Sequence, residues 1–182
     1  QFTYSSNYDK HKDYLSKYLL GMYNRVSWGR FYKKKFLKIN KIKFIEDKIH
    51  GRDILFCAEV FKSAKTINFD NTILVHSNMR KGSFSRNYSS KNIKSAIIIL
   101  NDMKELIGSN HKFSYCIFKI RTVFYHYFIS SERLSKSKWK ENIIELLSES
   151  PFNKLNSIKY ILSSNIAFFI ARKGCAFFKL NY

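Results

Sequence analysis

The chain has 182 residues, which is enough for one compact domain or for a smaller globular unit with a helical extension. Hydrophobic residues make up 45% of it and aromatic residues 17%, which excludes a disordered tail and allows a core. Lysine and arginine outnumber the acidic residues 33 to 13, so a net charge of +20 would attract phosphates, anionic lipid head groups or acidic polymers without choosing among them.

The cysteines give little sign of a structural role. Cys57, Cys116 and Cys175 are widely spaced and form no CxxC pair, which indicates neither a disulfide framework nor a zinc site, and a reducing cytosol fits best. No uncharged apolar run reaches the ~18 residues of a membrane helix. The sequence begins at Gln1 without an initiator Met or a signal-peptide pattern, so we expect a fragment or an excised domain.

In the first quarter of the chain, the spacing of apolar residues changes from helical to strand-like. Residues 8–23 place apolar side chains at spacings of three and four, which predicts a helix that ends near Gly21. Residues 26–32 are rich in β-branched and aromatic side chains and predict a strand, followed by a turn of helix over residues 33–39. A second short strand is expected at residues 42–45.

From Asp53 onward the spacing becomes helical again, with Asp53 well placed to cap the N-terminus of that helix. Two extended segments are expected next, at residues 65–69 and 71–77. The loop at residues 78–90 is polar, basic and glycine-containing, and its length is typical of a functional loop.

Beyond residue 90 the pattern is helical throughout. Four segments carry apolar residues at helical spacing: 91–107, 113–130, 133–148 and 152–163. We therefore expect a mixed, helix-rich α/β fold in two parts, a small α/β unit over residues 1–89 and a basic helical extension over residues 90–182.

Five short motifs between Trp28 and Ser85 resemble, in order and spacing, the second half of the family 2 glycosyltransferases, whose fold is GT-A. That family has a W-x-K-L-Y-K-x-x-F-L segment, then I-x-F, then E-D-x-x-F opening a helix, then two short strands and a Y-R-x-R-x-x-S-x-S loop. The matching residues are 28–37, 42–44, 52–56, 65–76 and 80–85. The resemblance implies the C-terminal, acceptor-side portion of a GT-A-like domain in an inverting enzyme. Such an enzyme moves a sugar from a nucleotide-sugar to a bacterial surface glycan, either capsule, lipopolysaccharide or lipooligosaccharide.

The same resemblance puts Asp53 at the position of the family's catalytic base, which takes the proton of an attacking acceptor hydroxyl. A helix N-terminus keeps such a carboxylate ionised, although the position also fits a plain N-cap. Where the family has Glu, this chain has Arg52, which could pair with Asp53 or hold an anionic acceptor. His50 is an alternative base, because imidazole titrates near neutrality, or an ordinary surface residue.

By resemblance, the loop that carries His76, Arg80, Lys81 and Ser83 folds over the donor diphosphate. There, cations and hydroxyls would offset the charge that grows on the departing nucleotide. A solvated basic loop is the plain alternative. Trp28 either offers an aromatic platform to an acceptor sugar or packs in the core.

Metal-dependent family members bind Mg²⁺ or Mn²⁺ through an Asp-x-Asp pair, which occurs nowhere in this sequence. We therefore expect the metal ligands and the donor-binding half to lie upstream of Gln1, and we assign no metal ligand within the chain.

The expected partners are a nucleotide-sugar donor, a glycan or lipid-linked glycan acceptor and an anionic membrane surface, at the cytoplasmic face of the inner membrane. Residues 158–182 alternate apolar clusters with Lys and Arg, which fits either docking on a bilayer or packing on the rest of the chain. A basic nucleic-acid-binding module and a membrane-docking helical module without catalysis are the alternatives. Against nucleic acid, the basic residues are spread over the whole chain and no zinc-finger or RNP-type motif is present.

Overall fold

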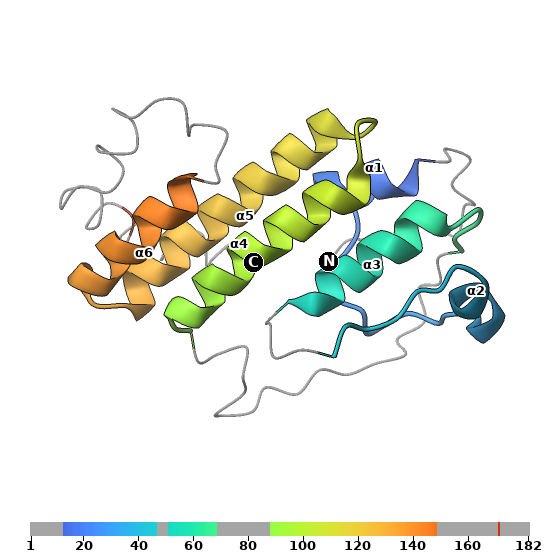
Figure 1. Cartoon of the computed structure of the whole chain (residues 1–182), viewed down its shortest axis with the longest axis horizontal. Coiled ribbons are helices and arrows are strands. Elements are labelled where there is room, and N and C mark those ends of the chain that lie inside the picture. The colour runs from blue at the N-terminus through green and yellow to red at the C-terminus, as the bar shows by residue number, and fades with distance from the viewer. Residues whose placement is uncertain (1–12, 47–50, 69–87, 149–170, 172–182) are drawn as a thin grey trace.

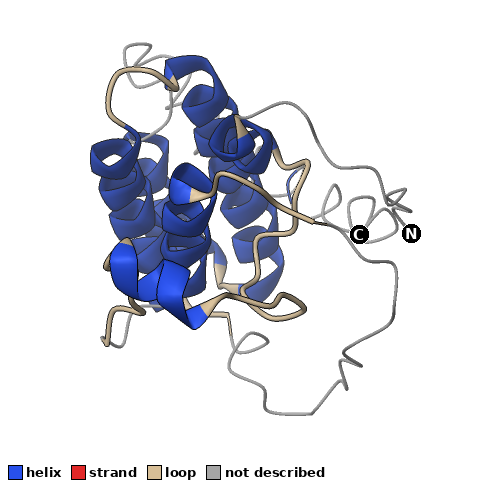
Figure 2. Cartoon of the chain, turned by 90° about the vertical axis from the view of Figure 1, so that its right-hand side faces the viewer, coloured by secondary structure: helices blue, strands red, loops and turns tan. Residues whose placement is uncertain are grey.

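The computed structural model describes residues 13–46, 51–68, 88–148 and 171. Within these residues the secondary structure consists of helices, and no strand is formed (Figure 1; Figure 2). The helices are α1 (Tyr14–Leu20), α2 (Lys34–Ile39), α3 (Arg52–Ser63), α4 (Ser90–Ile107), α5 (Lys112–Arg133) and α6 (Lys136–Ser148). The expected mixed α/β, GT-A-like fold is therefore wrong for the part of the chain that the structure describes.

The helices form a bundle in which α3, α4 and α5 lie side by side (Figure 1). α1 packs against α3 and α5, and α6 packs against α4 and α5. α2 lies at the edge, beyond α3, and buries none of its side chains completely. The order of packing thus brings helices from both halves of the sequence into one body.

One hydrophobic core joins the bundle. Its largest fully buried side chains come from different helices: Tyr14 and Tyr18 from α1, Phe118 from α5 and Trp139 from α6. Complete burial of each apolar side chain stabilises the fold by about 1.5–3 kcal/mol. The helices described on either side of residue 89 share this core. The division of the chain at that residue stays a prediction.

The predicted end of the first helix at Gly21 is confirmed. The Asp13 carboxylate accepts a hydrogen bond from the Ser16 backbone N–H at 3.0 Å and caps the start of α1. Gly21 has a φ of 85°, a left-handed conformation that glycine adopts at little cost. Beside it, the Arg121 guanidinium of α5 donates to the Leu20 carbonyl at 2.6 Å, so this helix end is satisfied from another helix.

The helix expected near Asp53 is confirmed, but its start differs from the prediction. Gly51, with a φ of 86°, is the N-cap residue, and α3 begins at Arg52. Asp53 therefore lies in the first turn of α3 rather than at the N-cap.

The strands predicted at residues 26–32 and 42–45 are wrong, since both segments are irregular loops on either side of the confirmed short helix α2. One aromatic residue of each segment, Tyr32 and Phe44, packs on α3 instead of pairing in a sheet. The Tyr32 ring meets the Phe56 ring edge-on at 5.3 Å, and the Phe44 ring stacks on Phe56 at 4.0 Å. Aromatic content thus reflects packing on a helix here, not a ladder of strands.

Residues 65–68 also form no strand, while residue 69, the strand predicted at 71–77 and the helix predicted at 152–163 lie outside the described residues. The helices predicted at 91–107, 113–130 and 133–148 are confirmed as α4, α5 and α6.

The buried hydroxyls of Thr122, Ser130 and Ser131 each donate to a carbonyl of α5 itself. Thr122 donates to the Phe118 carbonyl at 2.8 Å, Ser130 to that of Tyr127 at 3.1 Å, and Ser131 to that of Phe128 at 2.6 Å. Hydroxyls that donate to a carbonyl one turn back need no partner on a neighbouring helix. Among the helices that the structure describes, none is long and apolar enough to cross a bilayer.

Candidate functional site

The predicted site residues divide into two groups. Trp28, Arg52 and Asp53 lie in the described part of the chain. The other five lie outside the described residues: His50, His76, Arg80, Lys81 and Ser83. The expected approach of Asp53 to the basic loop therefore stays a prediction.

Asp53 lies on the first turn of α3, is half-buried, and is close enough to Tyr18 and Cys57 to affect their pKa values. The Tyr18 hydroxyl donates to the Ile54 carbonyl at 3.0 Å and so ties α1 to this turn. Burial, together with Cys57 and Asp53, raises the pKa of Tyr18 above its usual range, although Arg25 and Arg30 oppose the shift. Tyr18 thus remains a neutral hydrogen-bond donor next to the Asp53 carboxylate.

Arg52 forms an ion pair with Asp102 of α4. The Arg52 side chain is 13% exposed and that of Asp102 is 37% exposed, so the pair is partly buried between the two helices. Removal of Asp102 would leave the largely buried Arg52 guanidinium without this partner. The contact favours a structural task for Arg52, and its assignment to the acceptor stays a prediction.

The loop before α2 is held in place by Arg30. Its guanidinium donates to the carbonyls of Val26 and, at 2.5 Å, Asn24, and lies 3.5 Å from the Cys57 sulfur. It also lies 5.3 Å from the centre of the Phe61 ring, a cation–π distance. Arg30 therefore links the loop to Cys57 and Phe61 of α3.

Trp28 projects from this loop and is 54% exposed. The alternative that Trp28 packs in the core is therefore wrong. An exposed indole on a fixed loop is available to stack on the apolar face of a sugar or to enter another apolar surface.

Three of the five motif segments meet at one side chain. Phe56, one turn after Asp53 in α3, contacts the rings of Tyr32 from the first motif and Phe44 from the second. The Tyr32 hydroxyl donates to the Ser27 carbonyl at 2.8 Å, and burial with the nearby Cys57 raises its pKa. The segments at 28–37, 42–44 and 52–56 therefore form one local unit around the N-terminal half of α3.

Sequence reasoning did not identify Tyr18, Arg30 or Cys57 as neighbours of the first turn of α3. Burial raises the pKa of the Cys57 thiol, which Arg30 opposes, so this cysteine is a buried packing group rather than a nucleophile. Arg30 was a weak signal, because it is a single arginine within an aromatic stretch. The sequence alone does not indicate which helix it contacts.

A second cluster has the composition of a hydrolase triad but not its geometry. The Ser16 hydroxyl lies 3.0 Å from His111 Nδ1, and the Asp13 carboxylate lies 3.7 Å from the same nitrogen. A triad places its serine and its carboxylate on opposite ring nitrogens, so that the imidazole can relay a proton. This cluster instead joins the start of α1 to the start of α5.

The described residues contain no group of three or more His, Cys, Asp or Glu side chains that could hold a metal ion. The divalent metal implied by the resemblance would thus need ligands outside them.

Comparison of the chain with models of protein families, with characterised proteins and with solved structures gives no match.

Proposed function

We propose that the chain is the acceptor-side part of an inverting glycosyltransferase that transfers a sugar from a nucleotide-sugar to a bacterial surface glycan. One observation carries the proposal: the first three motif segments converge on Phe56, next to Asp53. The α/β arrangement is no longer part of it. In this proposal the donor and its divalent metal bind to a part of the protein outside the described residues.

Asp53 would act as the base. As the acceptor hydroxyl oxygen bonds to the anomeric carbon, its proton passes to the Asp53 carboxylate and the nucleoside diphosphate leaves with the bonding electrons. The N-terminal end of α3 supports this role, because its backbone N–H groups and dipole favour the ionised carboxylate. His76, Arg80, Lys81 and Ser83 would offset the charge on the leaving diphosphate.

Asp53→Asn in the intact enzyme tests the proposal. Loss of the base should lower turnover about 10²–10⁴-fold, with the thermal unfolding temperature nearly unchanged. The assay follows nucleotide release from a panel of nucleotide-sugars in the presence of lipid-linked glycan acceptors.

Glu59→Gln is the matched control, because it removes a carboxylate from the same helix without touching the first turn. It should keep normal turnover. If Asp53→Asn turns over as fast as this control, Asp53 is not the base.

A second candidate, a basic nucleic-acid-binding module without catalysis, is favoured by the net charge of +20. This candidate predicts tight binding to RNA or DNA that weakens steeply as the salt concentration rises, because each neutralised phosphate releases counterions. Nucleic-acid binding of that kind, with no nucleotide release from any donor, would favour this candidate over the transferase.

A further inference from the structure

The segment that contains α2 forms a separate arm on the bundle, which we define as residues 28–45. Tyr32 before α2 and Phe44 after it both contact Phe56, so the two ends of the arm are held at one point on α3. Between them, Phe36 and Leu37 of α2 pack partly against the core, and Ile42 after α2 is buried in it. Arg30 braces the entry to the arm through its bonds to the preceding loop.

The arm exposes apolar side chains that the core does not take up. Phe31 is 86% exposed and Ile39 is 67% exposed, the former next to Tyr32 at the entry and the latter at the end of α2. Trp28, Phe44 and Ile45 are exposed as well. Scattered exposed apolar residues are common, but five within one short arm form a concentration that suggests a docking surface.

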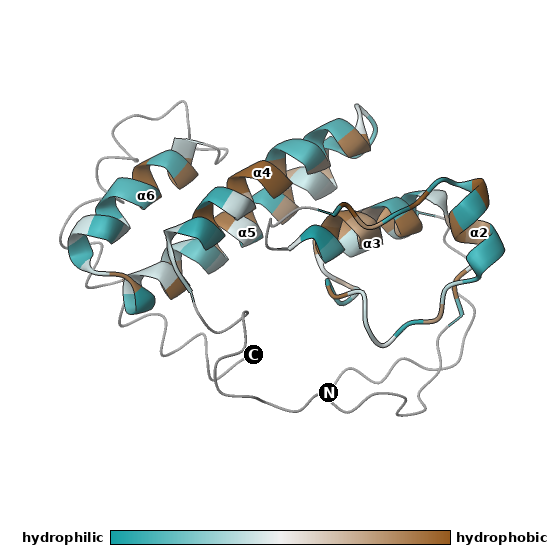
Figure 3. Cartoon of the chain, turned by 60° about the horizontal axis from the view of Figure 1, so that its bottom comes forward, coloured by the Kyte–Doolittle hydropathy of each residue, from teal (hydrophilic) through white to brown (hydrophobic). Residues whose placement is uncertain are grey.

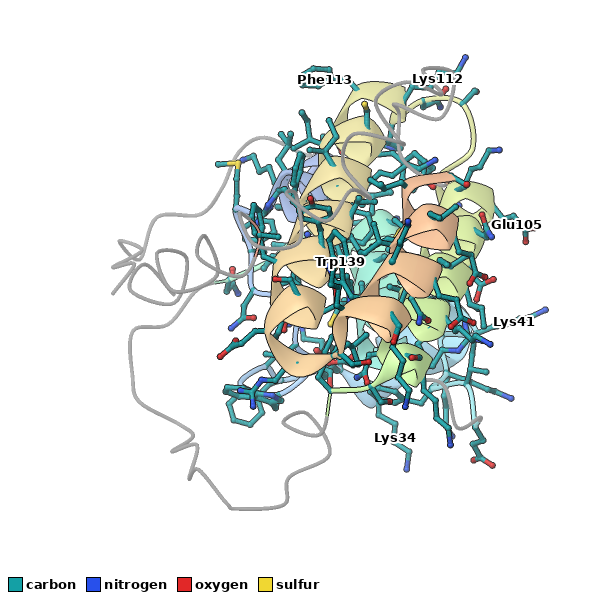
Figure 4. The ribbon with its side chains drawn as sticks, turned by 90° about the vertical axis from the view of Figure 1, so that its left-hand side faces the viewer. Lys34, Lys41, Glu105, Lys112, Phe113 and Trp139 are labelled. Carbon is teal, nitrogen blue, oxygen red and sulfur yellow. The ribbon has the colours of Figure 1, made fainter. Side chains whose placement is uncertain are left out.

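The charge of the arm has a single sign. Its sequence holds six lysines and no Asp or Glu, and all six lysine side chains are exposed: Lys33, Lys34, Lys35, Lys38, Lys41 and Lys43. Figure 4 shows Lys34 and Lys41 pointing away from the ribbon. Figure 3 shows hydrophobic and hydrophilic residues alternating along α2 and the chain on either side of it, at the end of the molecule away from α6.

We infer that this arm docks the protein on the surface of an anionic lipid bilayer. Aromatic and aliphatic side chains would enter the boundary between head groups and acyl chains, while the lysines meet the anionic head groups. A nucleic acid would account for the lysines and for stacking on Trp28 or Phe31. It would not account for Ile39 and Ile45, which have no ring to stack on bases.

The arm differs from the C-terminal segment at residues 158–182, of which the structure describes only Ala171. The inference also stands apart from the proposed glycosyl transfer. Asp53→Asn should bind vesicles as tightly as the unchanged protein, so the two proposals can fail separately.

Sedimentation of the full chain with vesicles tests the inference. We expect binding to vesicles of phosphatidylcholine with phosphatidylglycerol and little binding to phosphatidylcholine alone. The triple substitution of Lys34, Lys35 and Lys38 by Gln should weaken binding roughly 100-fold, because each lysine near an anionic leaflet contributes about a factor of five. Phe31→Ser should weaken it about tenfold or more, through loss of a buried aromatic ring.

Matched controls separate the arm from net charge and from general hydrophobicity. Substitution of Lys104, Lys138 and Lys140 by Gln removes three exposed lysines from α4 and α6. Phe113→Ser removes a ring that is 74% exposed on α5, at the opposite end from Lys34 in the view of Figure 4. Both controls should bind within about twofold of the unchanged protein, since exposed substitutions rarely alter the fold.

Trp28 gives an independent readout, because the sequence has only one other tryptophan, Trp139, which is fully buried. Vesicles that contain brominated acyl chains should quench the Trp28 emission. Trp28→Phe should remove the quenching while binding by sedimentation persists.

Three results would overturn the inference. One is the absence of binding to anionic vesicles. Another is an equal loss of binding in the arm variants and their controls, since net charge alone would then explain it. The third is binding of RNA or DNA, but not of vesicles, that the arm variants weaken.

Discussion

Gly21 is the residue at which α1 stops, and its neighbour leaves no room for a side chain. A Cβ built on Gly21 would lie 1.4 Å from an Arg121 guanidinium nitrogen. The same nitrogen donates to the Leu20 carbonyl, so the absence of a side chain and the helix-end bond depend on one another.

We predict that Gly21→Ala lowers the free energy of unfolding by about 2–4 kcal/mol. Left-handed strain accounts for about 1–2 kcal/mol of this, and displacement of a bond from a charged donor for much of the rest. Gly29→Ala is the control, because Gly29 has a φ of 77° but nothing within 4 Å of its Cβ position. Urea unfolding of both variants checks the difference, and equal losses would mean that the Arg121 contact contributes nothing.

At the scale of the elements, the sequence predicted that α3 is a helix but not which side chains pack against it. Its helical spacing was readable, as was that of α4, α5 and α6, because an amphipathic helix repeats over many residues. The loops around α2 were wrongly predicted as strands. Tyr32 and Phe44 pack their rings on Phe56, and this contact cannot be read from the local sequence pattern.

The candidate site was foreseeable only in part. The position of Asp53 near the start of a helix was predicted from the sequence. The N-cap is Gly51 instead of Asp53, because the chain enters α3 through a left-handed backbone conformation at that glycine. The approach of Tyr18 to Ile54 and the pairing of Arg52 with Asp102 join distant segments, so no spacing rule could give them.

The pH dependence of α3 follows from Glu59. Burial raises the pKa of Glu59 above its ordinary value of 4.5, and Lys62 opposes the shift. The folded state therefore holds the proton more tightly than the unfolded state. Ionisation of Glu59 lowers stability once the pH rises above 4.5, and the full loss is present above the folded pKa.

We expect Glu59→Gln to raise the melting temperature slightly near pH 7, and we expect this gain to vanish as the pH falls toward 4.5. Thermal unfolding followed by circular dichroism across this range provides the measurement. A gain that stays constant with pH would point to packing rather than to the carboxylate.

At the scale of the whole molecule, the described helices share a core that crosses residue 89. Leu19 of α1 and Trp139 of α6 are both fully buried in it. A core with members from both halves predicts one cooperative unfolding transition instead of two.

In a Trp28→Phe background, Trp139 is the only tryptophan and reports on α6. Leu19→Ala should destabilise the protein by about 2–5 kcal/mol, as expected for truncation of a buried leucine. Because α1 and α6 belong to the same unit, the Trp139 fluorescence transition should shift as far as the circular dichroism transition. If Leu19→Ala leaves the Trp139 fluorescence transition unshifted, the two halves of the chain unfold as separate units.

The hydroxyls inside α5 have a consequence for how its sequence can vary. Since Thr122, Ser130 and Ser131 donate only to carbonyls one turn back, replacing Ser130 or Ser131 by alanine removes a donor and leaves no neighbouring helix deprived. Alanine should therefore be readily accepted there, while a larger side chain at these fully buried positions would disturb the packing around α5. The last turn of α5 can thus change its chemistry over evolutionary time as long as its side chains stay small.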